Sequence, residues 1–419
     1  MASSAPTRIA FVGGGAAGFF AAITCAEKLR GASLVTLLER GPQFLAKVKI
    51  SGGGRCNVTH ACFEPRAFAE RYPRGERALI GALHRFQAAD TVRWFESRGV
   101  KLKTEADGRM FPITDNSQTV IDCLLRAATD TGVILQTQRG VEHVTRRAED
   151  GFELMLNTGE IILCDKLLLA TGGCRAAAGG ALAVSLGHTL VSPVPSLFTF
   201  HVTDARLTGL AGVAVERATV SVPGTKLSET GPVLVTHWGL SGPAILRLSA
   251  WGARELHKTN YQFPLRVNWL PDENLESAVK LSQAQREKFA ARKIWNTPPA
   301  ALPARLWERF ASAAGIDSEA RWATLTRAAT HALARQLVES EFHVTGKSLN
   351  KDEFVTCGGV KLNEVDFRTM GSRVCPGLFF AGELLDIDGI TGGFNFQAAW
   401  TTGWISGHAM AGLPIASEP

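Results

Sequence analysis

Residues 9–18 read Ile-Ala-Phe-Val-Gly-Gly-Gly-Ala-Ala-Gly, so Gly13, Gly15 and Gly18 form the pattern G-x-G-x-x-G. Glycines at these positions allow a tight turn, because they tolerate backbone conformations that other residues avoid. They also let backbone N–H groups and a helix N-terminus approach a pyrophosphate. On its own, however, the pattern is also typical of a glycine-rich helix start that binds nothing.

The segments on either side of these glycines give the pattern its context. An apolar run at 8–12 predicts a strand, the alanine-rich stretch 15–29 a helix, and the run 33–38 a second strand. This order predicts a βαβ unit of a parallel sheet with a right-handed crossover. Glu39 ends the second strand, where an acid binds the ribose hydroxyls of a dinucleotide. A helix start without a ligand would not require Glu39, so we predict a dinucleotide site.

An acid at this position favours an unphosphorylated ribose, so the sequence favours FAD or NAD over NADP at this site. Two further segments favour FAD. One is the polar glycine loop 51–57, Ser-Gly-Gly-Gly-Arg-Cys-Asn, and the other is the late segment 381–397. A cofactor as long as FAD needs a second anchoring point, and no second G-x-G-x-x-G follows a predicted strand. We therefore expect FAD, with NAD(P)H docking only transiently as the reductant.

The composition divides the chain into an interrupted α/β domain and an insertion. Short runs typical of β-strands begin after Ser192, and residues 275–335 have helical spacing. After Phe354 the sequence again combines predicted strands with glycine-rich turns, as in the N-terminal part. We expect a Rossmann-type FAD-binding domain interrupted by a β-rich substrate domain with a helical lid. Residues 1–192 and 356–419 are expected to form the two segments of the FAD-binding domain. Between them we expect the inserted β-rich domain at 193–274, the helical basic insertion at 275–335 and the return of the inserted domain at 336–355.

Several classes of protein are excluded by composition. The chain has 419 residues, of which 45% are hydrophobic and 20% charged, as in ordinary globular proteins. Its eight cysteines include no C-x-x-C pair, so neither a disulfide scaffold nor a zinc site is expected. The uncharged run 9–26 resembles a signal peptide, but four glycines interrupt it. We therefore expect a cytoplasmic protein with no membrane segment and no metal.

The formal net charge is +6, and most of it lies in residues 286–335. This basic segment contains nine Lys or Arg against four acids, together with Trp295, Trp307 and Trp322. Basic and aromatic side chains in this mixture are typical of RNA binding, through phosphate contacts and base stacking. The alternative is a helical lid with an apolar core and solvated arginines, because runs of charge usually form a solvated face.

Three motifs together resemble the YhiN/BaiN-type flavoproteins, a family also described as aminoacetone-oxidase-like. They are the stretch 49–57 (Lys-Ile-Ser-Gly-Gly-Gly-Arg-Cys-Asn), the stretch 236–243 (Thr-His-Trp-Gly-Leu-Ser-Gly-Pro) and Gly382-Glu383 followed by 392–397 (Gly-Gly-Phe-Asn-Phe-Gln). The match covers essentially the whole chain in order. The resemblance implies FAD-dependent reduction of an activated C=C bond, such as a uracil of large-subunit ribosomal RNA or a bile-acid enone. One branch of the family is described as an amine oxidase.

From the residues and the resemblance we predict a set of site residues. The predicted cofactor-binding residues are Gly13, Gly15, Ala17, Gly18, Glu39, Arg40, Lys47, Ser51, Gly52, Gly53, Gly54, Arg55, Cys56, Asn57, Thr171, Gly172, Gly382, Glu383, Gly392, Gly393, Phe394 and Asn395.

The predicted catalytic residues are His237, Cys56 and Asn395, and each has a simpler alternative. His237 precedes a glycine-rich turn and is either a proton donor or an ordinary core histidine. Cys56 is either a proton donor or a small buried side chain. Asn395, with Gly392 and Gly393, either approaches the flavin or caps a helix. Arg55 either neutralises an anion or forms a structural ion pair.

The expected function is therefore NAD(P)H-driven hydride transfer from the flavin to an activated C=C bond, with a uracil of ribosomal RNA as the favoured substrate. Ribosomal RNA would then contact the basic segment 286–335. Two alternatives stay open: a flavin oxidase or ene-reductase acting on a small amine or enone, and an RNA-binding assembly factor in which FAD is only structural.

Overall fold

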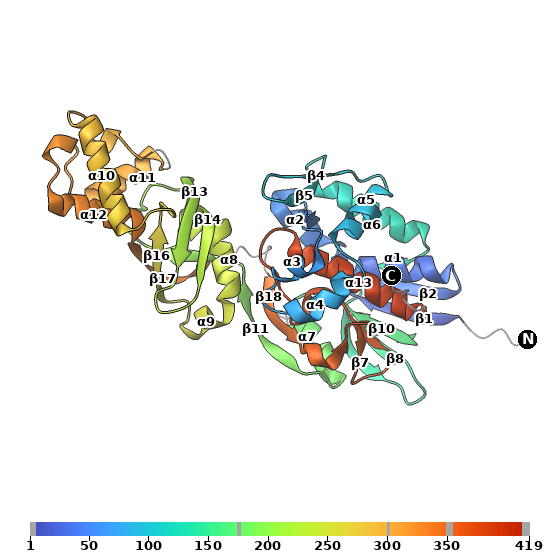
Figure 1. The fold of residues 1–419 in the computed structure, drawn as a ribbon. Helices are drawn as coiled ribbons and strands as arrows, with labels where there is room; N and C mark the ends of the chain where they lie inside the picture. Colours follow the sequence, from blue (N-terminus) through green and yellow to red (C-terminus); the bar gives the residue numbers. More distant parts are fainter. Residues whose placement is uncertain (1–5, 174–176, 300–301, 349–354, 413–419) are drawn as a thin grey trace, which may run out of the picture. The chain divides into compact units, whose positions relative to one another are not determined.

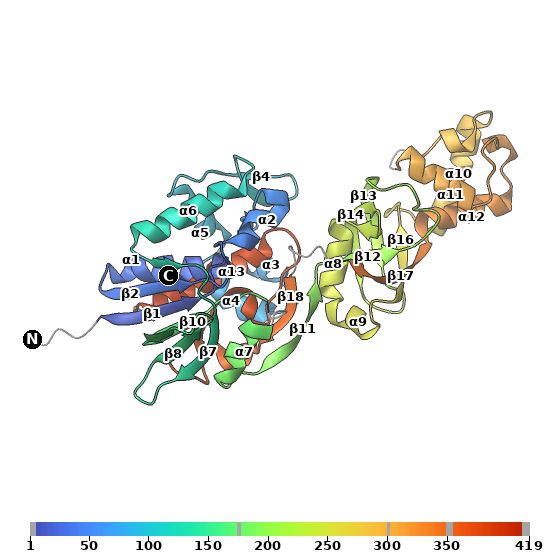
Figure 2. The ribbon, with the colours of Figure 1, turned by 180° about the vertical axis from the view of Figure 1, so that it is seen from behind.

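The computed structural model describes residues 6–173, 177–299, 302–348 and 355–412. Contacts within the chain divide it into two compact units, drawn in Figures 1 and 2. Unit 1 comprises residues 1–195 and 351–419, and unit 2 comprises residues 196–350. The chain thus leaves unit 1 once, builds unit 2 and returns, which makes unit 2 an insertion.

Unit 1 is built on a seven-stranded sheet of order β19-β20-β21-β10-β1-β2-β6. The five strands from β21 to β6 are parallel, and β19 and β20 add an antiparallel edge. The strands of this sheet are β1 (Thr7–Val12), β2 (Ser33–Leu38), β6 (Ile134–Gln136), β10 (Lys166–Leu169), β19 (Val365–Asp366), β20 (Gly371–Ser372) and β21 (Leu378–Phe380). The expected βαβ opening is confirmed, because β1 and β2 pair in parallel on either side of α1.

The other strands of unit 1 form smaller sheets. These are the sheet β3 (Thr59–His60), β5 (Arg109–Pro112) and β4 (Leu102–Thr104), the sheet β7 (Val141–Arg146), β8 (Phe152–Leu156) and β9 (Ile161–Cys164), and the pair β11 (Leu190–Ser196) and β18 (Val355–Val360). The helices of unit 1 are α1 (Ala16–Leu29), α2 (Ala46–Gly54), α3 (Pro65–Ala69), α4 (Glu76–Leu83), α5 (Ala88–Glu96), α6 (Ser117–Asp130), α7 (Ala177–Ser185), α13 (Phe394–Met410) and the short 3₁₀ helices η3 (Leu362–Glu364) and η4 (Gly382–Leu384).

Helices α1 and α13 pack side by side on one face of the large sheet, and the β7–β8–β9 sheet lies at the other face (Figure 1). Two glycines of α13 allow this close helix contact. A Cβ at Gly403 would lie 2.7 Å from the Ala17 carbonyl oxygen, and one at Gly407 would lie 2.5 Å from that of Ala21. The last helix, α13, therefore packs directly against the first, α1. Residues of both segments of unit 1 share one hydrophobic core.

Unit 2 is a closed six-stranded antiparallel barrel with helices attached. The barrel strands, in order around it, are β12 (Thr199–Val202), β15 (Gly239–Ser241), β14 (Ser228–Thr236), β13 (Ala214–Ser221), β16 (Phe263–Asn268) and β17 (Ser340–Ser348). The helices are α8 (Pro243–Trp251), α9 (Ala253–Lys258), α10 (Leu275–Phe289), α11 (Ala304–Ala313), α12 (Arg327–Val338) and the 3₁₀ helices η1 (Ile294–Asn296) and η2 (Trp322–Thr324). A single hydrophobic core joins the barrel and the helices.

Candidate functional site

The carboxyl ends of the parallel strands bring four predicted segments to one edge of the sheet. Gly13 follows β1, Glu39 follows β2, Thr171 lies just beyond β10, and Gly382 lies just beyond β21. Ligands of open α/β sheets bind at this edge, because the loops there are free to vary while the strands hold them in place. The edge is therefore the first place to test for a dinucleotide site.

The glycine turn after β1 has the geometry that a pyrophosphate site needs. A Cβ at Gly13 would lie 2.2 Å from the Ala170 carbonyl oxygen, and one at Gly18 would lie 2.0 Å from that of Gly13, so both positions require glycine. Gly15 is different, because a Cβ there would meet open space. Gly15 is also the N-cap of α1, and no side chain caps this helix end. The helix N-terminus is thus left free for an anion.

Glu39 is oriented by the glycine turn itself. Its Oε2 accepts a hydrogen bond of 2.8 Å from Gly14 N, and its Oε1 accepts one of 2.7 Å from Gly41 N. These bonds hold the partly exposed carboxylate beside the turn, in the position expected for a ribose ligand. The neighbouring Arg40 forms an ion pair of 3.6 Å with Glu142. Glu142 lies in β7, and the predicted contact of Arg40 with the cofactor stays a prediction.

Thr171 carries a polar atom that requires a partner. Its Oγ1 is buried, and among the described residues it makes no hydrogen bond. A buried hydroxyl without a partner is costly, so such an atom at this edge points to a ligand. A Cβ at the adjacent Gly172 would meet open space. The free helix end, the oriented acid and the unpartnered hydroxyl together fit a bound dinucleotide.

The second half of the chain contributes η4 to this edge. A Cβ at Gly382 would lie 2.8 Å from Ala17 Cβ, so η4 touches the start of α1. Glu383 Oε2 forms an ion pair of 2.7 Å with Lys47 Nζ of α2, while its Oε1 accepts a hydrogen bond of 2.9 Å from Thr356 N. The predicted residues Gly382, Glu383, Ala17 and Lys47 therefore lie together.

The glycine loop 51–57 is a sharply kinked segment at the end of α2. Gly52, Gly53 and Gly54 have φ angles of +58°, +68° and +83°, which glycine adopts without strain. A Cβ at Gly53 or Gly54 would meet open space, so these residues leave room for a ligand. Ser51 donates a hydrogen bond of 2.8 Å to the Val48 carbonyl and keeps the kink in place.

The expected role of Cys56 as a proton donor does not agree with the structure. Its side chain has no exposed surface and belongs to the core of unit 1. Burial raises the pKa of the Cys56 thiol to about 12, although a hydrogen bond with Ser51 opposes the rise. A thiol enclosed in the core cannot reach a substrate, so Cys56 is a packing residue.

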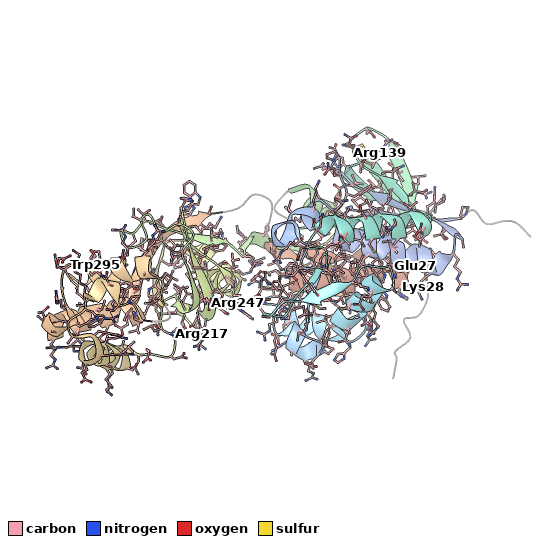
Figure 3. The ribbon with its side chains drawn as sticks, turned by 90° about the horizontal axis from the view of Figure 1, so that it is seen from above. Glu27, Lys28, Arg139, Arg217, Arg247 and Trp295 are labelled. Carbon is pink, nitrogen blue, oxygen red and sulfur yellow. The ribbon has the colours of Figure 1, made fainter. Side chains whose placement is uncertain are left out.

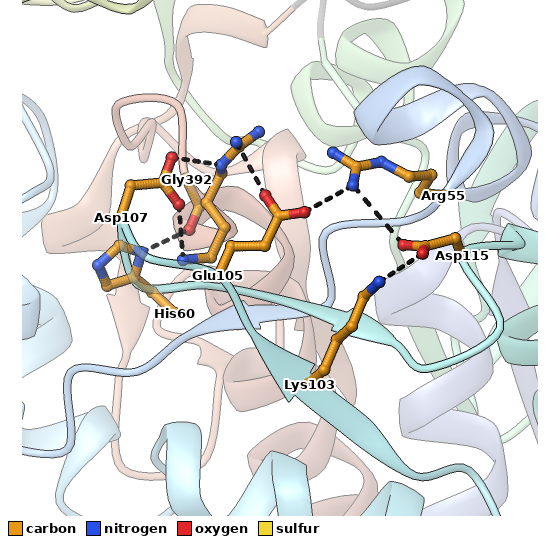
Figure 4. A network of polar contacts seen from close by, with 8 residues as sticks. Arg55, His60, Lys103, Glu105, Asp107, Asp115 and Gly392 are labelled. Atoms are coloured by element: carbon orange, nitrogen blue, oxygen red, sulfur yellow. Dashed lines mark hydrogen bonds and ion pairs between the residues drawn. The ribbon is translucent and has the colours of Figure 1, made fainter.

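Arg55 belongs to a network of charges on the β3–β5–β4 sheet (Figure 4). Its Nη1 lies 2.6 Å from Glu105 Oε1 and 3.6 Å from Asp115 Oδ1, and its guanidinium stacks 4.0 Å from the centroid of the Phe111 ring. The hydrogen bond to Glu105 raises the pKa of the Arg55 guanidinium. The structure thus shows the ion-pair alternative for Arg55, whose contact with a cofactor stays a prediction.

The late segment 386–395 forms a tightly held loop before α13. Asp388 is fully buried and pairs with Arg74, whose Nε donates a hydrogen bond of 2.6 Å to Asp388 Oδ1. Asn395 Oδ1 accepts from Gly389 N and its Nδ2 donates to Gly389 O, both at 2.9 Å. Asn395 was predicted to be catalytic, but its amide holds the loop in this structure. The Phe394 ring is likewise buried and faces the protein core.

His60 is a residue that the sequence analysis missed. Its Nδ1 lies 3.0 Å from the Gly392 carbonyl oxygen, and its ring stacks on Phe394 with centroids 4.7 Å apart. A lone histidine after Thr59 carries no recognisable pattern, so only the structure shows that it meets the late loop. Asn57, which was predicted, contacts the same loop through Gly393 N.

His237 lies in unit 2, on the turn between β14 and β15. It is exposed and is followed by Trp238, whose side chain is 69% exposed. His237 is therefore no core histidine, and its role as a proton donor stays a prediction. Next to this turn, His201 Nε2 is buried and has no hydrogen-bond partner among the described residues.

The tryptophans of the basic segment are not a stacking surface. Trp307 and Trp322 are each 1% exposed, and their indole N–H groups donate to the Ile294 carbonyl and to Thr297 Oγ1. Trp295 is partly exposed (Figure 3) and donates to the Ile316 carbonyl. The expected base stacking on Trp307 and Trp322 is therefore wrong, because these rings form the core between the helices of unit 2. The basic side chains around them are mostly exposed.

Fold and site together define a dinucleotide-binding oxidoreductase of the Rossmann type with an inserted barrel. A model of the HI0933-like protein Rossmann domain matches residues 7–409. The chain belongs to this family, whose members are FAD-dependent oxidoreductases. The resemblance drawn from the three sequence motifs is thereby confirmed.

Two relatives match over nearly their whole length. The ribosomal RNA dihydrouridine synthase of Escherichia coli (strain K12) is 33% identical over 403 residues, which cover 94% of this chain and 95% of that protein. The 3-dehydro-bile acid delta(4,6)-reductase of Clostridium scindens (strain ATCC 35704 / DSM 5676 / VPI 13733 / 19) is 29% identical over 415 residues, covering 97% of this chain and all of that protein.

Among solved structures, a 3-ketosteroid-delta4-(5alpha)-dehydrogenase from Rhodococcus jostii RHA1, in complex with 4-androstene-3,17-dione, is similar in fold. The TM-score is 0.51 at 13% identity, with 98% of each chain covered. This likeness agrees with the expected fold class, a Rossmann-type domain with an inserted domain. Within the described residues, no helix is both long and apolar enough to span a membrane.

Proposed function

We propose that this protein is an NAD(P)H-driven flavoenzyme that reduces the C5=C6 bond of a uracil in ribosomal RNA. The observation that carries the proposal is the cradle at the carboxyl edge of the sheet, formed by the open Gly15 position, Glu39 and Thr171. The named relatives support the reaction class, because both names describe saturation of a C=C bond.

The residues of unit 1 would hold FAD. The free N-terminus of α1 would bind its pyrophosphate, and Glu39 would accept hydrogen bonds from its ribose hydroxyls. The segments around Gly53 and Gly392 would bind the other end of the cofactor. When bound, FAD supplies a hydride to the substrate after it has accepted one from NAD(P)H. One hydride and one proton together saturate one C=C bond, so the protein must also position a proton donor.

Of the three predicted catalytic residues, we carry His237 forward as the proton donor. Cys56 is enclosed in the core, and the amide of Asn395 is bonded to Gly389 on both sides. His237 is exposed and lies beside the exposed Trp238. Histidine is the side chain best suited to exchange a proton near neutral pH.

The basic surface of the unit 2 helices supports RNA over a small enone. Eight of the nine basic side chains in segment 286–335 are exposed: Arg286, Lys288, Arg292, Arg305, Arg309, Arg321, Arg327 and Arg335. A surface with this charge attracts a phosphate backbone, whereas a neutral enone gains nothing from it. Ribosomal RNA as the substrate would also place the protein in the cytoplasm.

The test compares ribosomal RNA from cells with and without the gene. Mass spectrometry of RNA fragments is expected to show one uridine lighter by two hydrogens in the strain that lacks the gene. Purified protein with NADH or NADPH, under anaerobic conditions, should restore that mass. Identical RNA from the two strains, together with turnover of a conjugated enone, would instead favour the small-molecule reductase. Turnover that needs dioxygen would identify an oxidase.

A further inference from the structure

Two side chains form hydrogen bonds with the peptide group between Gly392 and Gly393, one with its carbonyl oxygen and one with its N–H. His60 Nδ1 donates to the Gly392 carbonyl oxygen at 3.0 Å (Figure 4). Asn57 Oδ1 accepts from Gly393 N at 2.9 Å, in the amide orientation that gives partners to both of its polar atoms. The C=O and N–H of one trans peptide point in opposite directions, so these two side chains fix the orientation of a single peptide plane.

This peptide needs such support because two glycines flank it. Gly392 and Gly393 have φ angles of +131° and +93°, and glycine has many alternative conformations of similar energy. A Cβ at Gly393 would lie 2.5 Å from the backbone of Thr59, so the loop is pressed against the strand that carries His60. The bonds between Asn395 and Gly389 involve neither the carbonyl of Gly392 nor the N–H of Gly393.

The protonation state of His60 follows from its partner. A carbonyl oxygen only accepts, so Nδ1 must carry a proton. Burial lowers the pKa of the His60 imidazole, and the charges of Arg71 and Arg109 lower it further, while the bond to Gly392 and the charge of Asp107 oppose them. His60 is therefore a neutral donor at neutral pH. Its ring also stacks on Phe394, which fixes the plane of the imidazole.

The Gly392–Gly393 peptide lies at the N-terminus of α13, where Gly393 is the N-cap and no side chain caps the helix. We propose that His60 and Asn57 are positioning residues for the flavin: they select one orientation of the Gly392–Gly393 peptide and so preset the N-terminal turn of α13 that the cofactor contacts. The inference rests on the proposed use of residues 392–395 in FAD binding. It assigns to His60 a task that acts through the backbone and not through contact with the substrate.

Three variants separate this task from simple packing. His60→Phe keeps a ring over Phe394 but removes the donor, and His60→Leu removes both. His60→Asn places an amide donor where Nδ1 lies and serves as the conservative rescue. In apoprotein, hydrogen exchange of the amides of residues 392–396 should accelerate about five- to tenfold in the Phe and Leu variants, the loss expected for one hydrogen bond. The Asn variant should exchange like the wild type.

The same variants are then titrated with FAD, with flavin fluorescence and absorbance as readouts. The Phe and Leu variants should bind FAD about five- to tenfold more weakly and show a shifted flavin absorbance band, whereas the Asn variant should resemble the wild type. Unchanged hydrogen exchange in both the Phe and Leu variants would show that His60 does not fix the orientation of the Gly392–Gly393 peptide. Faster hydrogen exchange with unchanged FAD affinity and an unchanged flavin spectrum would show that the orientation of this peptide does not affect the flavin. Failure of the wild type itself to bind FAD would overturn the proposed function.

Discussion

Lys47 and Glu383 lie 336 residues apart in the sequence, yet Lys47 Nζ and Glu383 Oε2 form an ion pair of 2.7 Å. The pair joins α2 of the first segment of unit 1 to η4 of the second. Glu383 also accepts the N–H of Thr356, so one carboxylate holds together three separate parts of the chain. The second segment of unit 1 thus contributes η4 to the carboxyl edge of the sheet, where we propose that the cofactor binds.

The two partners of this pair should differ in their importance for stability. Lys47→Met should lower the free energy of unfolding by at most about 1 kcal/mol, because the Lys47 side chain is 57% exposed and solvent screens the pair. Glu383→Ala should cost about 1–2 kcal/mol more, since the buried N–H of Thr356 loses its acceptor. Urea denaturation of the apoprotein measures both values. Glu383→Gln keeps an acceptor and should resemble Lys47→Met; equal costs for all three variants would contradict this assignment.

Glu39→Ala should weaken FAD binding about ten- to a hundredfold, because hydrogen bonds to a charged acceptor contribute roughly 1.5–3 kcal/mol. Calorimetric titration of the apoprotein with FAD measures the change. Glu39 also bonds Gly14 N and Gly41 N, so the melting temperature of the apoprotein is the necessary control. Glu39→Gln keeps one acceptor and should show an intermediate affinity. FAD affinity like that of the wild type in Glu39→Ala would mean that Glu39 is not the ribose ligand.

The local part of this site could be predicted from the sequence. Gly13, Gly18 and Glu39 lie within one βαβ unit, and the spacing of the three residues follows from the length of a strand, a turn and a helix. The structure shows the reason for each glycine, such as the contact that a Cβ at Gly13 would make with Ala170. Such short-range constraints leave a recognisable pattern in the sequence.

The long-range part of the site could not be predicted in this way. His60 and Gly392 are 332 residues apart, and nothing in either neighbourhood shows that they meet. Composition also misled the interpretation of Trp307 and Trp322, because an amphipathic helix can carry exposed arginines and buried rings in one segment. For Cys56, the glycine loop indicated a reactive position, whereas the fold turns the thiol into the core.

The buried pair of Arg74 and Asp388 should be essential for stability. Asp388→Ala should lower the free energy of unfolding by about 3–5 kcal/mol, because it removes the carboxylate that pairs with a largely buried guanidinium. The matched control is Glu160→Ala, which breaks an exposed pair with Arg139 in the same unit (Figure 3) and should cost less than about 1 kcal/mol. Chemical denaturation followed by tryptophan fluorescence compares them. Similar losses in the two variants would contradict the importance of burial.

His408 should make the protein less stable in acid. Burial, together with the smaller effect of the charge of Lys28, lowers the pKa of the His408 imidazole from 6.5 to about 4. Between these two values the unfolded chain binds a proton that the folded chain does not, so the free energy of unfolding falls as the pH drops through this window. His408→Gln should reduce this fall in melting temperature, whereas Gln in place of the exposed His143 should leave it unchanged. An unaltered slope in His408→Gln would contradict the assignment.

The basic surface of unit 2 gives the sharpest test of an RNA substrate. Lys288, Arg292, Arg327 and Arg335 are exposed, and among the described residues their side chains form no hydrogen bond or ion pair with the protein. Lys288 and Arg292 contact only the Phe289 ring, each at 5.1 Å from its centroid, which adds little at an exposed site. Replacing all four by Gln should therefore leave folding intact. If they contact phosphates, the variant should bind ribosomal RNA more weakly, and its log–log salt dependence should flatten by about 0.7–0.9 per lost contact.

Reduction of the flavin by NADH or NADPH should stay unchanged in this quadruple variant, because charges that bind phosphates take no part in electron transfer to the flavin. The matched control replaces four exposed cations of unit 1, Arg30, Arg77, Lys101 and Arg126, and carries the same change in net charge. A general effect of net charge would weaken RNA binding equally in both quadruple variants, whereas a specific surface on unit 2 would weaken it only in the first. Wild-type RNA binding at every salt concentration in the unit 2 variant would reduce the basic segment to a solvated face, and the RNA proposal would then rest on the relatives alone.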